Sequence, residues 1–120
     1  MSAKLKTRNV DDVAILDLSG RITLGEGSGM VRNAIKELVA AGSRKILINL
    51  HDVTYMDSAG LGELVGSYAT VTNLGGQIKL LHPQGKVTDM LTVTKLYTIF
   101  TSFDDEEAAL DSFSGGAATA

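Results

Sequence analysis

The sequence predicts a single α/β domain in which about four helices cover a mixed, mostly parallel sheet. Short apolar runs of strand length alternate with longer segments whose apolar residues recur at helical spacing, which is typical of helices packed on a parallel sheet. The first two strand-like segments follow each other without a helix between them. They are therefore expected to form an N-terminal antiparallel hairpin, which makes the sheet mixed.

Four segments in the N-terminal half support this prediction. Strands are expected at residues 4–9, 13–18 and 45–50, and a helix is expected at residues 29–41. Asp11 and Asp12 lie between the first two strands and accept turn geometry readily. Gly42 is placed to end the helix with a positive φ, and the nearly continuous apolar run that follows is typical of a central strand.

The C-terminal half continues the alternation. Strands are expected at residues 77–81 and 98–101, and helices at residues 58–73, at residues 87–96 and after the acidic run 104–107. Gly75 and Gly76 end the first of these helices, and Pro83 interrupts the chain before the next. The acidic run places negative charge in the first turn of the last helix, where the helix dipole favours it.

Length and composition limit the possible functions. The 120 residues are 44% apolar, which suits one core, and we expect residues 1–113 to form the domain and residues 114–120 a flexible tail. The apolar runs are far shorter than the roughly 20 residues of a membrane span. Eleven basic and fourteen acidic residues give a net charge of −3, which does not favour nucleic acid. Because there is no cysteine and no secretory signal, we expect a cytoplasmic protein without disulfides.

Two features that suggest a ligand or enzyme site have simpler explanations. The run Gly25-Glu26-Gly27-Ser28-Gly29 could cradle a phosphate, but Met30 stands where a dinucleotide fingerprint has glycine, and a flexible connection is expected instead. His51 and His82 have no cysteine or carboxylate framework that would make a metal or nucleophile site. We therefore expect no enzyme activity, no catalytic residue, no cofactor and no metal.

The aspartates after the central strand raise a further alternative. Asp52 or Asp57 could accept a phosphate, as an aspartate does in the receiver domain of a response regulator. Receivers also resemble one another in an acidic pair at the end of the first core strand and a lysine after the last strand. Here Asp11-Asp12 precede their strand and Thr101-Ser102 end the last one, so two of the three groups are missing.

The start of the helix at residues 58–73 is the strongest candidate site. Ser58 can cap this helix by accepting a hydrogen bond from a backbone amide two or three residues further on. Gly60, Gly62 and Gly66 lie inside the helix, where each costs about 1 kcal/mol relative to alanine. Another backbone, from this chain or from a partner, could lie on a stripe of small residues three or four positions apart. The members of that stripe are Ala59, Gly62, Gly66 and Thr70.

The segment Val53-Thr54-Tyr55-Met56-Asp57-Ser58-Ala59-Gly60-Leu61-Gly62, preceded by Asn49-Leu50, resembles the signature of STAS-domain anti-sigma factor antagonists. The resemblance extends from about Lys4 to Leu110 and includes Ser19-Gly20-Arg21-Ile22 after the second strand. It implies a regulator of transcription that acts by partner switching. The unphosphorylated form binds an anti-sigma factor, and the sigma factor is released. Subunits of stress-sensing scaffolds and of transporters share the domain and are alternatives.

The resemblance also implies a site and two partners. Ser58 is the residue that the anti-sigma factor, a serine kinase, phosphorylates, and a metal-dependent serine phosphatase reverses the reaction. The expected partner surface consists of Asp57, Ser58, Ala59, Gly60, Gly62 and Gly66, together with Arg21 and Thr23. Thr23 stands where many family members carry an acidic residue. A phosphate adds a charge of about −1.5 to −2 at Ser58, which should block binding. The free protein is expected to be a monomer.

Overall fold

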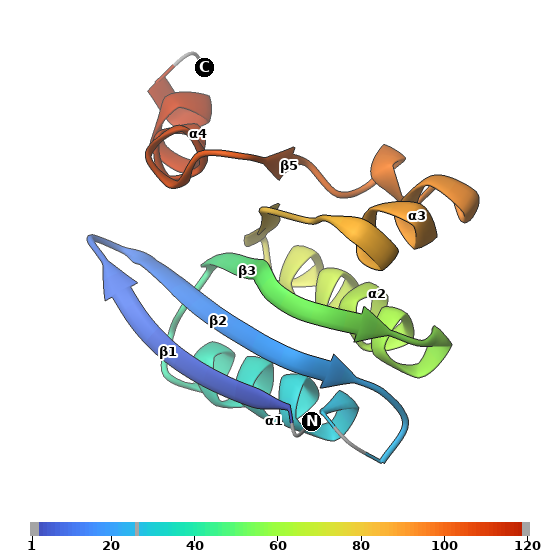
Figure 1. The fold of residues 1–120 in the computed structure, drawn as a ribbon. Helices are drawn as coiled ribbons and strands as arrows, with labels where there is room; N and C mark the ends of the chain where they lie inside the picture. Colours follow the sequence, from blue (N-terminus) through green and yellow to red (C-terminus); the bar gives the residue numbers. More distant parts are fainter. Residues whose placement is uncertain (1–2, 26, 119–120) are drawn as a thin grey trace.

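The structure, a computed structural model, describes residues 3–25 and 27–118 (Figure 1). Its elements are β1 (Lys4–Val10), β2 (Val13–Ile22), α1 (Ser28–Ala40), β3 (Lys45–Met56), α2 (Ser58–Asn73), β4 (Gln77–Leu81), α3 (Gly85–Val93), a 3₁₀ turn (Leu96–Thr98), β5 (Ser102–Phe103) and α4 (Glu106–Ala118). The predicted alternation of strands and helices is confirmed. The predicted tail, residues 114–120, begins within α4, and its residues 119–120 lie outside the described part of the chain.

The strands form one sheet in the order β1-β2-β3-β4-β5. β1 is antiparallel to β2, and every later pair of neighbours is parallel. The hairpin turn contains Asp11, whose φ of 54° lies in the left-handed region that aspartate tolerates. The predicted mixed, mostly parallel sheet with an N-terminal hairpin is therefore confirmed.

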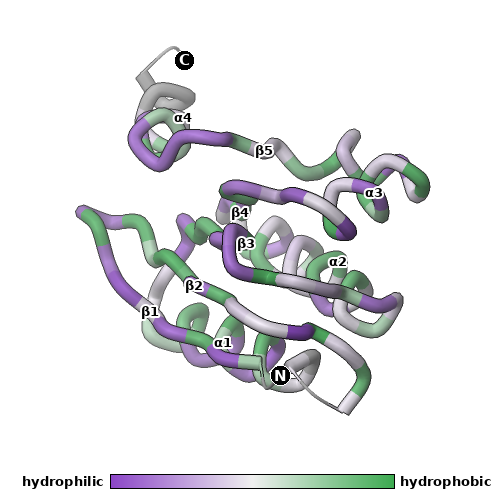
Figure 2. Tube along the Cα trace, viewed as in Figure 1, coloured by the Kyte–Doolittle hydropathy of each residue, from purple (hydrophilic) through white to green (hydrophobic). Residues whose placement is uncertain are grey.

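The two faces of the sheet are covered differently. Successive strand residues point to opposite faces, so Ile46 and Ile48 pack against α1, α2 and α3, whereas Leu47 packs against α4 (Figure 1). Figure 2 shows the first half of β2 as mainly hydrophobic, while hydrophobic and hydrophilic residues alternate around α1. These patterns are the ones that buried strands and a surface helix require.

The prediction of a strand at residues 98–101 is wrong. Leu96–Thr98 form a 3₁₀ turn, and β5 comes later, at Ser102–Phe103. The turn directs Phe100 into the core, where its ring lies 5.4 Å from the ring of Tyr68. The apolar residues of this segment are therefore buried by tertiary packing and not by a strand.

Strands β2 and β3 both extend beyond their predicted ends. They stay paired as far as Ile22, which lies opposite Met56, although the register shifts twice along the way. Both of these side chains are buried in the core beneath α1 and α2. The extension brings the end of β2 beside the residues that begin α2, which is where the candidate site lies.

Candidate partner-binding site

The residue that caps α2 is Asp57 and not Ser58, contrary to the prediction. Asp57 has an extended backbone, and its Oδ1 accepts a hydrogen bond from the Gly60 amide at 3.0 Å. Ser58 is already the first helical residue, so its hydroxyl does not occupy the capping position. Both residue types favour the N-cap, and the local sequence alone does not decide between them.

The second carboxylate oxygen of Asp57 holds the turn that follows β2. Oδ2 accepts a hydrogen bond from the Leu24 amide at 3.1 Å, and the Asp57 amide donates to the Ile22 carbonyl at 3.3 Å. The Gly60 and Leu24 amides, in that order, hold the pKa of Asp57 below its usual range. Asp57 is therefore ionised at neutral pH and joins two segments that lie far apart in the sequence.

The first turn of α2 combines an exposed serine with a tightly packed glycine. Ser58 is exposed and Ala59 is half-buried, whereas Gly60 is buried. A Cβ atom at Gly60 would overlap the Ile22 carbonyl oxygen and would lie 2.8 Å from Cγ of Met56. The close approach that this glycine permits is therefore made within the chain, to the end of β2.

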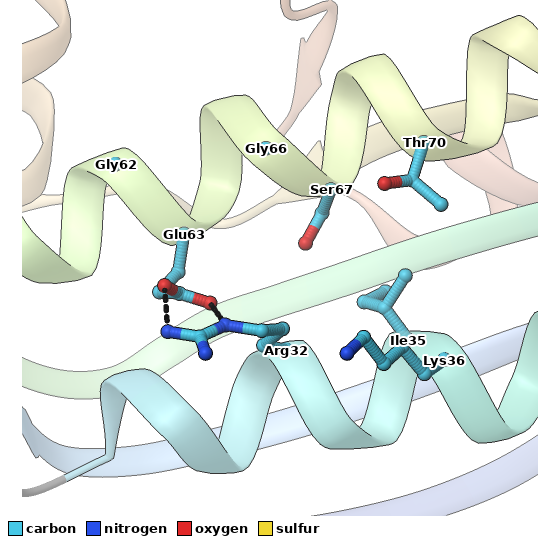
Figure 3. A pocket seen from close by; sticks show the side chains of 8 residues that line it. All are labelled: Arg32, Ile35, Lys36, Gly62, Glu63, Gly66, Ser67 and Thr70. Carbon is cyan, nitrogen blue, oxygen red and sulfur yellow. Dashed lines mark hydrogen bonds and ion pairs between the residues drawn. The ribbon is translucent and has the colours of Figure 1, made fainter.

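Gly62 and Gly66 lie on the exposed side of α2, and no atom other than those of the adjoining helix backbone lies within 4 Å of where their Cβ atoms would be. They border a hollow of about 210 Å³ between α1 and α2 (Figure 3). The hollow is lined by Arg32, Ile35, Lys36, Gly62, Glu63, Gly66, Ser67 and Thr70. Three members of the stripe of small residues, Gly62, Gly66 and Thr70, thus line an open recess.

An ion pair joins the two helices at one end of this recess. Arg32 of α1 donates from Nε and Nη2 to the two carboxylate oxygens of Glu63 of α2, at 3.1 and 2.9 Å (Figure 3). Its two parallel hydrogen bonds give the pair a defined geometry. The sequence analysis did not identify it, because residues 31 positions apart show no local pattern.

Arg21 and Thr23 lie differently from the rest of the predicted set. Ile22 points into the core, so its neighbour Arg21 points to the opposite face of the sheet, where its guanidinium lies 4.6 Å from the centre of the Tyr55 ring. Thr23 forms a β-bridge with Gly27 and precedes Leu24 in the turn bonded to Asp57. The structure thus brings Thr23 close to the start of α2 and places Arg21 on the other face.

Sequence reasoning missed Leu24, whose side chain is 79% exposed although it is large and apolar. The available signal was a lone leucine between Thr23 and Gly25, outside the periodicity of any strand or helix. Within residues 3–25 and 27–118, no cluster of three or more His, Cys, Asp or Glu side chains could hold a metal. No helix in the same ranges has the length and apolar character needed to span a membrane.

Comparisons with known proteins give the family. The STAS domain model matches residues 4–109. The anti-sigma-B factor antagonist of Bacillus subtilis is 30% identical over 92 residues, which are 77% of this chain and 82% of that protein. A crystal structure from Thermotoga maritima, of a protein proposed to be an anti-sigma factor antagonist, has a TM-score of 0.85 at 27% identity, covering 91% of this chain and 93% of its own.

A further solved structure shows likeness of fold alone, because its identity is 21%. It is the phosphorylated form of the cell fate determinant SpoIIAA of Bacillus, with a TM-score of 0.73 over 91% of this chain and 98% of that one. The family model covers nearly all of the described elements, including the whole of the candidate site. The chain therefore belongs to the STAS domain family.

Proposed function

We propose that this chain is an anti-sigma factor antagonist that is switched by phosphorylation of Ser58. Its unphosphorylated form binds an anti-sigma factor that is also a serine kinase, and the sigma factor is thereby released. The observation that carries the proposal is the exposed Ser58 at the start of α2, next to the open surface of Gly62 and Gly66. The relative in Bacillus subtilis, which is named as an antagonist of an anti-sigma factor, supports the same assignment.

The shape of α2 favours a binding surface along one side of the helix. Ser58, Gly62 and Gly66 are four residues apart, so they lie on one side of the helix. At the two glycines no side chain stands between the helix backbone and solvent, so a partner backbone can approach closely. The hollow beside them can receive side chains of the partner. The partner that fits is a protein with a closely packed contact surface, which excludes water at the centre of the interface.

The charge of a phosphate group on Ser58 would be enough to switch binding off. A phosphate on Ser58 adds a charge of about −1.5 to −2 beside the ionised Asp57. The N-terminus of α2 tolerates this charge, so the domain should stay folded. Binding of the phosphorylated form would instead bury an unpaired dianion in the interface, which is costly. A cost of only about 2.7 kcal/mol is enough to lower the affinity a hundredfold. A metal-dependent serine phosphatase would restore the binding form.

Membership of the STAS family and the contacts of Asp57 both disfavour the response-regulator receiver alternative. Both carboxylate oxygens of Asp57 are engaged by backbone amides, which leaves this aspartate poorly suited to accept a phosphoryl group. Asp11 and Asp12 lie in the hairpin turn before β2, at the end of the sheet opposite to the one where β3 leads into Asp57. The acidic constellation of a receiver is therefore not formed around Asp57.

The proposal is tested with the purified protein and the anti-sigma factor from the same organism. With Mg-ATP present, mass spectrometry should find phosphate on Ser58, and Ser58→Ala should abolish it. Ser102→Ala is the matched control, because Ser102 is also exposed but lies on β5. Calorimetry should show binding of the unphosphorylated protein and at least hundredfold weaker binding of the phosphorylated form. Modification that persists in Ser58→Ala, or equal affinities for the two forms, would contradict the proposal.

A further inference from the structure

Leu24 is unusual among the exposed apolar side chains. Four large hydrophobic residues are strongly exposed in the described part of the chain, namely Leu24, Leu74, Val93 and Tyr97. Leu24 is the one whose backbone is bonded to the residue preceding Ser58. Its side chain therefore stands in solvent close to the start of α2, at the edge of the surface proposed for the partner.

Three residues described around Leu24, namely Thr23, Gly25 and Gly27, have a defined backbone geometry. Thr23 and Gly27 form a bridge across the turn that carries Leu24, and Gly25 and Gly27 have φ values of 80° and 95°, which favour glycine. A Cβ atom at Gly27 would lie 2.9 Å from Cβ of Ala3 and 3.2 Å from the Arg21 carbonyl oxygen. Gly27 thus allows close packing against the start of the chain and the end of β2. A side chain whose own backbone is held by such contacts loses less entropy on binding than one on a mobile loop.

Asp57 connects this turn to α2. Its Oδ1 accepts from Gly60 at 3.0 Å and its Oδ2 accepts from Leu24 at 3.1 Å, so one carboxylate fixes both segments. The Asp57 amide adds a third link by donating to the Ile22 carbonyl. The position of Leu24 relative to Ser58 therefore depends on this carboxylate.

We infer that Leu24 is an apolar anchor that enters an apolar recess of the anti-sigma factor, and that Asp57 is the residue that positions it. This inference rests on the proposed function, because the occupant is the partner named there. Binding would remove the exposed leucine from water beside the start of α2, which extends the contact from α2 onto the preceding turn.

The arrangement gives phosphorylation a second effect. A phosphate on Ser58 repels the neighbouring Asp57 carboxylate and competes with it for the amides at the start of α2. When Oδ2 moves away, the Leu24 amide loses its acceptor and the turn loosens. Phosphorylation then weakens binding by releasing the anchor as well as by placing a charge in the interface.

The anchor is tested by calorimetry with the unphosphorylated protein and the anti-sigma factor. Leu24→Ala should weaken binding at least tenfold, whereas the control Leu74→Ala, at the far end of α2, should stay within twofold of wild type. If wild type binds and Leu24→Ala binds equally well, the anchor is refuted while the proposed function stands. If wild type itself does not bind, the proposed function fails and the anchor fails with it.

The positioning role of Asp57 is tested in the free protein by amide hydrogen exchange. Asp57→Asn keeps an oxygen to cap α2, and its amide group cannot accept from Leu24 in place of Oδ2. The Leu24 amide should exchange at least tenfold faster in this variant, while the core amide of Leu80 keeps its rate. Asp52→Asn, an exposed aspartate on β3, is the control and should leave both rates unchanged. An unchanged rate at Leu24 in Asp57→Asn overturns the coupling.

Discussion

Alanine should have opposite effects on stability at Gly60 and at Gly62, although the two glycines are neighbours on α2. At Gly60 the new methyl group would overlap the Ile22 carbonyl oxygen and lie 2.8 Å from Cγ of Met56. The carbonyl belongs to a paired strand and cannot move aside cheaply. At Gly62 the methyl group meets no atom within 4 Å other than those of the adjoining helix backbone.

The magnitudes follow from two competing terms. Replacing a helical glycine with alanine stabilises a helix by up to about 1 kcal/mol, and this gain is available in full at Gly62. Overpacking costs about 1–3 kcal/mol, and the clash at Gly60 is with backbone, so the upper part of that range applies. We expect Gly60→Ala to lose about 1–2 kcal/mol and Gly62→Ala to gain about 1 kcal/mol.

Thermal unfolding followed by circular dichroism checks the pair directly. For a domain of this size, 1 kcal/mol moves Tm by about 4 °C, so the two variants should melt on either side of wild type. Gly62→Ala should also bind the anti-sigma factor more weakly, because its methyl group projects from the proposed contact surface. The reasoning is refuted if Gly60→Ala melts at or above the midpoint of Gly62→Ala.

Three further outcomes are expected. Ser58→Ala should have the same melting temperature as wild type, because the carboxylate of Asp57, and not the Ser58 hydroxyl, caps α2. Ser58→Asp should bind the anti-sigma factor with an affinity between those of the unphosphorylated and phosphorylated forms, which calorimetry measures. Burial raises the pKa of Asp17, but hydrogen bonds from Arg8 and Asn49 outweigh this effect and the pKa is lowered. The pKa of Glu106 is also lowered, mainly by its hydrogen bonds from Arg8. The stability that these carboxylates contribute is therefore present above their unfolded pKa of about 4 and is lost as the pH falls through their folded pKa values. In Arg8→Gln, the urea concentration at the unfolding midpoint should therefore fall less steeply with decreasing pH than it does in wild type. Phe113→Ala should cost about 3–5 kcal/mol, because this ring is buried between the sheet and α4 in a second core cluster, which consists of Val13, Ile15, Leu47, Leu81, Ala109 and Phe113. A chain that ends at residue 114 should keep the wild-type midpoint, and a large loss of stability on truncation would contradict the proposed boundary at residue 113.

Local patterns predicted most of the fold. The bounds of α2 and β4 agree with the periodicity and with the glycines that separate them, and the hairpin followed from two strand-like runs around Asp11. The second half of β3 was missed because exposed residues such as His51 and Asp52 interrupt its apolar run. Its pairing depends on β2, which lies far away in the sequence.

The sequence pattern predicted where α2 begins but not the contacts that hold its first turn. The segment around Ser58 identified the start of α2, and its glycines indicated close approach. Gly60 is the glycine that packs closely within the chain, and it does so against the Ile22 carbonyl, about 40 residues earlier in the sequence. The choice of Asp57 as the cap goes together with its bond to Leu24, 33 residues away. Propensity rules, which consider neighbouring residues, do not contain this information.

The order of the sheet has a consequence for how the chain folds. Each strand pairs with the next strand of the chain, so the hairpin closes a short turn and each later pairing spans a connection that contains only one α-helix. The sheet can therefore grow from its N-terminal hairpin while later residues are still being synthesised. The second core cluster is the exception, since Val13 and Ile15 of the first hairpin are covered by Ala109 and Phe113 of α4. The first strands to form therefore keep an apolar face uncovered until the last helix has docked.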